Sequence, residues 1–92
     1  MIPKTFDIFG ERHKVSFVKK VDNKDSVGEW DPAKNRIRIK RDLPQDQKEQ
    51  TYFHELLHRI PFHLSYNELN DDEEFIDRTS KAMHQAIKTS CY

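Results

Sequence analysis

The sequence contains a single cysteine, Cys91, so no disulfide bond can form within the chain. This usage fits a reducing compartment, and a thiol beside the chain end is expected to be exposed. No apolar run resembles a signal peptide or reaches membrane-spanning length, which predicts a cytoplasmic protein with no membrane partner. The sixteen basic and sixteen acidic residues cancel. A global electrostatic field that would favour nucleic acid is therefore absent, and nucleic-acid binding is not expected.

Hydrophobic residues are also scarce, at 35% of the 92 residues, and charged residues make up another 35%. A chain of this length forms one domain, which we take to span residues 1–92. A lean core in so small a domain predicts marginal stability, to which a bound metal ion would contribute. The oligomeric state cannot be inferred from these features.

The first part of the chain, about residues 4–41, has the patterns of β-strands. Alternation in "KTFDIFG", a turn at Gly10-Glu11 and the stretch "HKVSFVKKV" predict a hairpin. "VGEWD" is a candidate short strand, and "RIRIK" alternates Ile37 and Ile39 with basic residues. These strands predict a small antiparallel sheet with one solvated face.

Helical spacing replaces this alternation after Pro44. Phe53, Leu56, Leu57 and Ile60 recur along one face until Pro61, which predicts a helix over about residues 44–60. "HLSYNELN" is expected to be a connection. Asp71 or Asp72 can cap a second helix over about residues 71–89, whose apolar positions are Phe75, Ile76, Ala82, Met83, Ala86 and Ile87. The predicted fold class is α+β, with the sheet followed by two helices.

The first helix contains the segment "HELLH", residues 54–58. Side chains four residues apart on a helix point to the same side, so His54 and His58 are placed to chelate one metal ion. Glu55 lies beside them in angle, at the position of the general base in zinc peptidases. With the apolar residues on the opposite face, we expect all three polar residues to lie on the non-core face, which opens on a cleft.

A catalytic zinc ion usually has a third protein ligand. His63 is one residue out of register for a known three-histidine pattern, and Pro61 stands where that pattern has glycine, so His63 is interpreted as a solvent-facing loop residue. In the second helix Glu73 borders the apolar face, Glu74 points away, and Asp77 follows Glu73 by one turn. The alternative, that this acidic turn only complements the helix dipole, remains open at this point.

The segments "QTYFHELLHRI" and "NDDEEFIDRTSKAMHQ" resemble small gluzincin-type metallopeptidases related to the ImmA/IrrE family, which are often found in phages and mobile elements. The resemblance extends from about Lys4 to Gln85 and implies a minimal zincin-like fold. It implies that His54, His58 and Glu73 bind Zn²⁺. It also implies that Glu55 activates water to cleave a protein or peptide substrate, and that Asp77 supports the site. The chain has no room for the additional domains of larger members, so substrate and regulation are not implied.

Several further side chains are assigned from the residues alone. Tyr66 is the preferred phenol for stabilising the oxyanion, with His63 and Tyr52 as alternatives. Residues 27–31 are the candidate edge strand for pairing with an extended substrate, although Gly28 is equally well a loop glycine. His84 lies too far along the second helix to share the metal of Glu73. His13 is expected at the surface.

Two other functions remain under consideration. A non-enzymatic, zinc-stabilised module that binds a protein partner is favoured by the lean core and the small surface available for a cleft. A nucleic-acid binder would use the basic strand "KNRIRIKR", although the balanced charge of the chain argues against it.

Overall fold

The structure, a computed structural model, describes residues 2–91 and begins with a β-hairpin. Strands β1 (Thr5–Ile8) and β2 (Glu11–Val18) pair antiparallel, with Phe6 opposite His13. The turn between them is formed by Phe9 and Gly10, whose φ angles are 48° and 82°. A two-residue turn with two positive φ angles matches the twist of the flanking strands, which explains a glycine here. The predicted hairpin is confirmed.

The sheet is mixed, and the prediction of an antiparallel sheet was wrong for its central pair. The strand order is β1-β2-β4-β3, where β3 is Gly28–Asp31 and β4 is Arg36–Lys40. β4 pairs antiparallel with β3 but parallel with β2. The physical reason is the polar connection after β2, residues 19–27, which carries the chain past the position that β4 later fills. As a result β3 is an edge strand.

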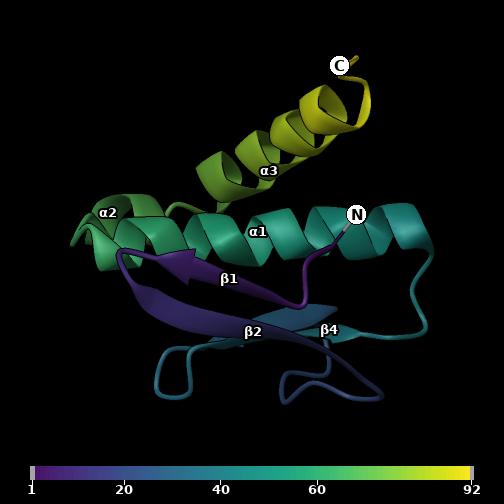
Figure 1. Cartoon of the computed structure of the whole chain (residues 1–92), viewed down its shortest axis with the longest axis horizontal. Coiled ribbons are helices and arrows are strands. Elements are labelled where there is room, and N and C mark those ends of the chain that lie inside the picture. The colour runs from purple at the N-terminus through teal and green to yellow at the C-terminus, as the bar shows by residue number, and fades with distance from the viewer. Residues whose placement is uncertain (1, 92) are drawn as a thin grey trace.

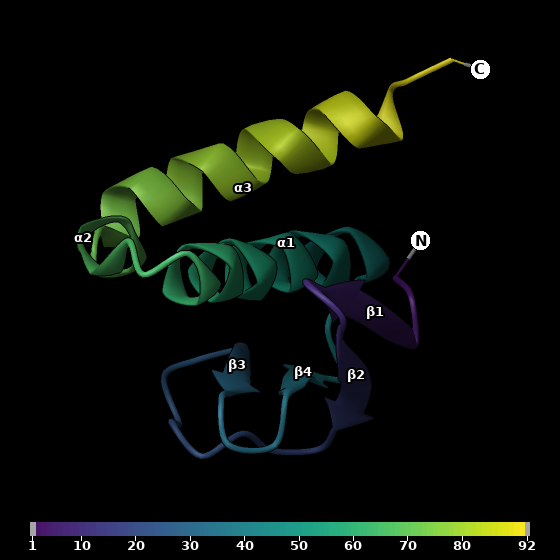
Figure 2. The same cartoon turned by 60° about the vertical axis from the view of Figure 1, so that its left-hand side comes forward.

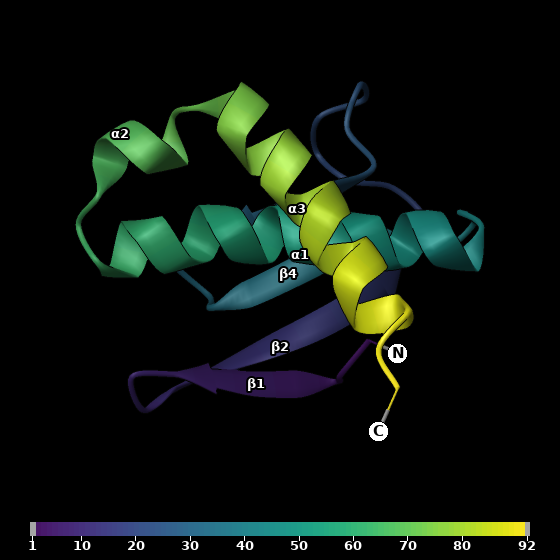
Figure 3. The same ribbon diagram turned by 90° about the horizontal axis from the view of Figure 1, so that it is seen from above.

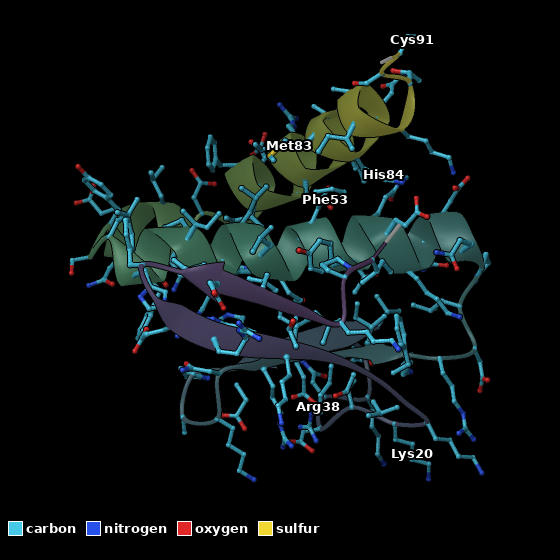
Figure 4. The ribbon with its side chains drawn as sticks, in the orientation of Figure 1. Lys20, Arg38, Phe53, Met83, His84 and Cys91 are labelled. Carbon is cyan, nitrogen blue, oxygen red and sulfur yellow. The ribbon has the colours of Figure 1, made fainter. Side chains whose placement is uncertain are left out.

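The two faces of β4 have opposite character, as its alternation predicts. Ile37 and Ile39 are almost fully buried, at 1% and 0% exposed, and form the core cluster together with Tyr52. Arg38 points from the other face of the sheet, away from the helices (Figure 4). There its guanidinium contacts Glu29 at 2.6 Å and Asp22 at 3.1 Å. The solvated face is therefore covered by ion pairs.

The first helix is longer than predicted. α1 spans Gln45–His63, so Pro61 lies inside the helix and does not end it at residue 60. A proline within the last turn removes only the hydrogen bond to the carbonyl of Leu57, and its fixed φ remains compatible with a helix. The end is stabilised by the N–H of Leu64, which donates to Ile60, and by the N–H of Tyr66, which donates to Pro61. The Pro61 side chain itself is buried.

Two helices follow. The expected connection after α1 contains a short helix, α2 (Asn67–Asn70), which was not predicted. α3 spans Glu73–Lys88, close to the predicted range, and Asp72 caps it by accepting a hydrogen bond from the N–H of Phe75 at 3.0 Å. Its apolar positions are less buried than the helical spacing predicts. Ile76 is fully buried, whereas Phe75 and Ile87 are 41% and 49% exposed.

The elements form three layers: the sheet, α1 and α3 (Figures 1 and 2). α3 crosses over α1, and α2 lies at the carboxyl end of α1 (Figure 3). Because α1 is covered by the sheet on one side and α3 on the other, buried residues occur on more than one of its faces, among them Glu55 and Arg59. The fold class is α+β, as predicted. Among residues 2–91 no helix is long and apolar enough to cross a membrane.

Candidate metal centre

The two motif histidines project from adjacent turns of α1 toward the start of α3. Their ring centroids are 5.0 Å apart. The carboxylate of Glu73 spans both rings, with Oε1 at 2.9 Å from Nε2 of His58 and Oε2 at 3.4 Å from Nε2 of His54. One ligand atom from each residue lies within 4.8 Å of the other two. Residues far apart in sequence thus bring two imidazole nitrogens and one carboxylate oxygen to a single point.

The cap of α3 decides which glutamate reaches the histidines. Because Asp72 caps the helix, Glu73 is the first helical residue, and the fully buried Ile76 fixes the rotation of α3 against its neighbours. Both carboxylates are largely exposed, but Glu73 contacts the histidines whereas Glu74 pairs with Arg78 at 2.9 Å. The helical angles used in the sequence analysis predict this difference between the two adjacent carboxylates.

His58 is oriented by Asn70, a residue that sequence reasoning missed. Its Nδ1 lies 3.0 Å from both the backbone carbonyl oxygen and the side-chain Oδ1 of Asn70. A carbonyl oxygen only accepts, so Nδ1 carries the proton, and in a neutral ring the lone pair of Nε2 faces Glu73. Two lone-pair groups 2.9 Å apart are stable only with a proton or a cation between them. The donor set and this orientation fit a divalent metal such as zinc.

Asp77 stands behind His54 but makes a weaker contact. The distance from His54 Nδ1 to Asp77 Oδ1 is 4.0 Å, which is longer than a hydrogen bond. The other carboxylate oxygen of Asp77 accepts from Lys81 at 3.0 Å. Burial lowers the pKa of His54 and His58 adds to this effect, while Glu73 and Asp77 act to raise it. The ring is thereby favoured in its neutral form, the form that binds metals.

Glu55 lines the cleft on this side of α1, as the helical pattern predicts, but its side chain is largely buried. It is only 8% exposed, because α1 is covered on both sides and β3 passes close to this position. A Cβ atom placed on Gly28 would lie 3.8 Å from Cγ of Glu55. Burial raises the pKa of Glu55 to about 7, and the negative charges of Glu73 and Glu29 add to the rise. A cation bound at the histidines would lower this pKa again.

A groove runs past Glu55 between β3 and the helices. It consists of a cavity of about 320 Å³ that extends along α1 toward Gln47 and Lys81, and a second of about 620 Å³ that extends toward Asn70. Both are lined by Ser26, Gly28, His54 and Glu55. The candidate metal ligands and the edge strand therefore open on one continuous surface.

Tyr66 is separate from this surface. It is 60% exposed, precedes α2 and lines neither cavity of the groove. His63 is not grouped with the proposed ligands either, and it is not a solvent-facing loop residue. It lies at the end of α1 with its side chain 14% exposed and its Nε2 3.1 Å from Glu11.

His13 is buried, and its assignment to the surface was wrong. It is 1% exposed because its ring stacks on Phe6 and accepts a hydrogen bond at Nε2 from the Nε–H of Arg59, at 2.7 Å. Arg59 also donates to Asn35 at 2.6 Å. The hydrogen bond between His13 and Arg59 links the hairpin to α1 directly beside His58. An isolated histidine in a strand gives no local signal of such a partner, so the sequence did not predict its burial.

His84 is buried as well and contacts α1. Its Nε2 lies 2.8 Å from Oε1 of Glu49, and its ring lies beside Phe53 between the two helices (Figure 4). His84, Glu49 and Asp46 form a second group of potential metal ligands. Lys88 already contacts both carboxylates there, so its ammonium supplies the positive charge. His84 is not grouped with Glu73, as the sequence predicts. Cys91 is exposed.

No known protein family, characterised protein or solved structure matches this chain significantly. The functional argument therefore rests on the geometry of the groove and the chemistry of its residues.

Proposed function

We propose that the protein is a zinc-dependent peptide-bond hydrolase, a metallo-endopeptidase in which His54, His58 and Glu73 hold the metal. The observation that carries the proposal is the convergence of these three donors beside the buried carboxyl of Glu55. A lone pair on His58 that faces a carboxylate calls for a positive charge between them. The resemblance to ImmA/IrrE-type metallopeptidases belongs to the same proposal and implies the same ligands.

Zinc, when bound, polarises a carbonyl group and lowers the pKa of water. The remaining tasks fall to the chain itself. Glu55 accepts a proton at its carboxylate and returns it to the leaving amine, since its carboxyl group lines both halves of the groove. β3 has a free edge along the groove, where an extended peptide can pair with its main chain. Tyr66 has no part in this scheme, because it does not line the groove.

The metal assignment is tested by elemental analysis and by competition titration with a chromogenic chelator. We expect one zinc per chain and a loss of affinity of at least about ten-fold in Glu73→Gln, because an amide is a weaker ligand than a carboxylate. Glu74→Gln is the matched control: it makes the same chemical change one residue away, on a side chain that points outward. Equal effects of the two substitutions would contradict the assignment of Glu73.

The catalytic assignment is tested with zinc-loaded protein and an unfolded protein substrate. We expect Glu55→Gln to reduce cleavage by at least about a hundred-fold, the usual contribution of a general base, with zinc content unchanged. Glu74→Gln should cleave like the wild type. A Glu55→Gln protein that retains full activity would refute the role of Glu55. If the wild-type protein holds zinc but does not cleave the substrate, the proposed peptidase activity is refuted.

The second candidate is a zinc-stabilised module that binds a protein partner without cleaving it. It is favoured by the small buried apolar face of α3, on which Ile76 is the apolar side chain that is fully buried. A metal that joins α1 to α3 would then stabilise the fold. In that case chelation would unfold the protein, and Glu55→Gln would leave partner binding intact.

Nucleic-acid binding gains no support from the basic strand. Arg36 lies 3.6 Å from Asp31, and Arg38 pairs with Asp22 and Glu29. Arginines already held by carboxylates have less free charge to offer to phosphates. Titration against duplex DNA at physiological salt is expected to show no binding.

A further inference from the structure

The groove is lined by more acidic residues than lysine or arginine residues, although the net charge of the chain is zero. Besides His54 and His58, the one basic residue among the described residues that line its two cavities is Lys81. Six acidic residues line them: Asp25, Glu29, Glu55, Asp71, Glu73 and Asp77. Acidic side chains therefore outnumber lysine and arginine side chains where the proposed substrate would lie.

Four of the six carboxylates already have a role or a partner. Glu73 faces the two histidines, and Glu55 is buried beside them, at 8% exposed, as the proposed proton acceptor. Asp77 contacts Lys81, and Glu29 contacts Arg38 at 2.6 Å from the far side of the sheet. The metal and the internal ion pairs therefore leave Asp25 and Asp71 to be explained.

Asp25 and Asp71 are exposed and lie in opposite halves of the groove. Asp25 belongs to the loop before β3 and lines the half that reaches Gln47, whereas Asp71 lies between α2 and α3 in the half with His58. Among residues 2–91 neither carboxylate takes part in an ion pair. Both residues therefore line the groove without an ion-pair partner of their own, one in each of the two halves that meet at Glu55.

We infer that the groove selects peptide segments that carry lysine or arginine on both sides of the position facing Glu55, through Asp25 on one side and Asp71 on the other. An extended chain on the β3 edge would present alternate side chains to these two carboxylates. Because the molecule as a whole is neutral, this attraction is local and distinguishes among substrates. The cleavage of such segments rests on the proposed function, whereas their binding does not.

The test measures binding of fluorescein-labelled peptides of equal length to the zinc-loaded Glu55→Gln protein by fluorescence anisotropy. The peptides differ only at two flanking positions, which are lysine, glutamine or glutamate. We expect the lysine peptide to bind more tightly than the glutamine peptide by about two- to five-fold for each flanking charge, as for exposed ion pairs. The glutamate peptide should bind more weakly than both. High salt should reduce these differences, since exposed charges are screened.

Charge-neutralising variants connect this preference to the two carboxylates. In the Glu55→Gln background, Asp25→Asn and Asp71→Asn should each remove about two- to five-fold of the lysine preference, and together most of it. Asp42→Asn is the matched control, because Asp42 is exposed and lines neither cavity of the groove. Equal binding of the three peptides, or a preference that survives the double substitution, would overturn the inference.

A parallel cleavage assay with the wild-type protein separates this inference from the proposed function. If the lysine peptide binds selectively but remains intact, the groove selects basic segments and the proposed peptidase activity fails. If peptides are cleaved without regard to flanking charge, the activity stands and the inference fails.

Discussion

Gly28→Ala is expected to destabilise the fold through one identifiable clash. The added Cβ would overlap Cγ2 of Thr51 on α1 and lie 3.3 Å from the carbonyl oxygen of Arg38. Thr51 cannot turn aside easily, because β-branched side chains are restricted in helices and its hydroxyl donates to the carbonyl of Gln47 at 2.7 Å. Overpacking of this kind costs about 1–3 kcal/mol in the free energy of unfolding.

The substitution Thr51→Ser should relieve this clash. Serine lacks the clashing methyl group but keeps the hydroxyl, so alone it should cost about 1 kcal/mol for one buried methyl. In Gly28→Ala/Thr51→Ser the clash is removed, and we expect the pair to be less destabilised than the sum of the single changes by about 1–2 kcal/mol. The close approach to the Arg38 carbonyl keeps the rescue incomplete.

The assay is urea unfolding of all four proteins, followed by far-UV circular dichroism with a chelator present. Gly10→Ala serves as the control. A Cβ at Gly10 meets no atom within 4 Å, so its cost arises from the positive φ of 82° alone and should not change with Thr51→Ser. Additive effects of Gly28→Ala and Thr51→Ser would refute the proposed contact between β3 and α1.

Three further predictions concern buried ionisable groups. Arg59→Met should cost about 2–4 kcal/mol in urea unfolding, because His13 and Asn35 lose their hydrogen-bond donor. Burial lowers the pKa of His13 below 6.5, so the folded state binds fewer protons than the unfolded state, and stability should fall as the pH drops below about 6.5; this slope should be smaller in His13→Gln. Burial raises the pKa of Glu55 from 4.5 to about 7, so stability is lost as the pH rises through that range. In urea unfolding without metal, the free energy of unfolding of Glu55→Gln should then exceed that of the wild type by up to roughly 3 kcal/mol at alkaline pH. Below about pH 4.5 the two proteins should be equally stable.

The sequence predicts the elements and much of the candidate site because local periodicity is informative there. Alternation identifies Ile37 and Ile39 as core residues, and helical angles correctly separate Glu73 from Glu74. The assignments of His54, His58 and Glu73 as ligands, of Glu55 as base and of the metal as zinc stay predictions.

Features that depend on contacts between distant segments could not be predicted in the same way. The parallel pairing of β2 with β4 depends on how a polar loop crosses the sheet, and alternation gives no strand direction. His13 is buried only because Arg59 approaches from another element. Glu55 is buried because α1 is covered on both sides and β3 passes close to it, and the orientation of His58 depends on Asn70 in the connection between helices.

The position of β4 between β2 and β3 also determines the order in which the fold can be completed during synthesis. The hairpin β1–β2 can form as soon as it is made, but β3 has no neighbour in the sheet until residues 36–40 appear. The central strand is thus the last strand made, and α1 begins five residues after it ends. We expect the sheet and the helix that covers it to fold together in one late step, so that nascent chains ending before β4 contain little more than the first hairpin.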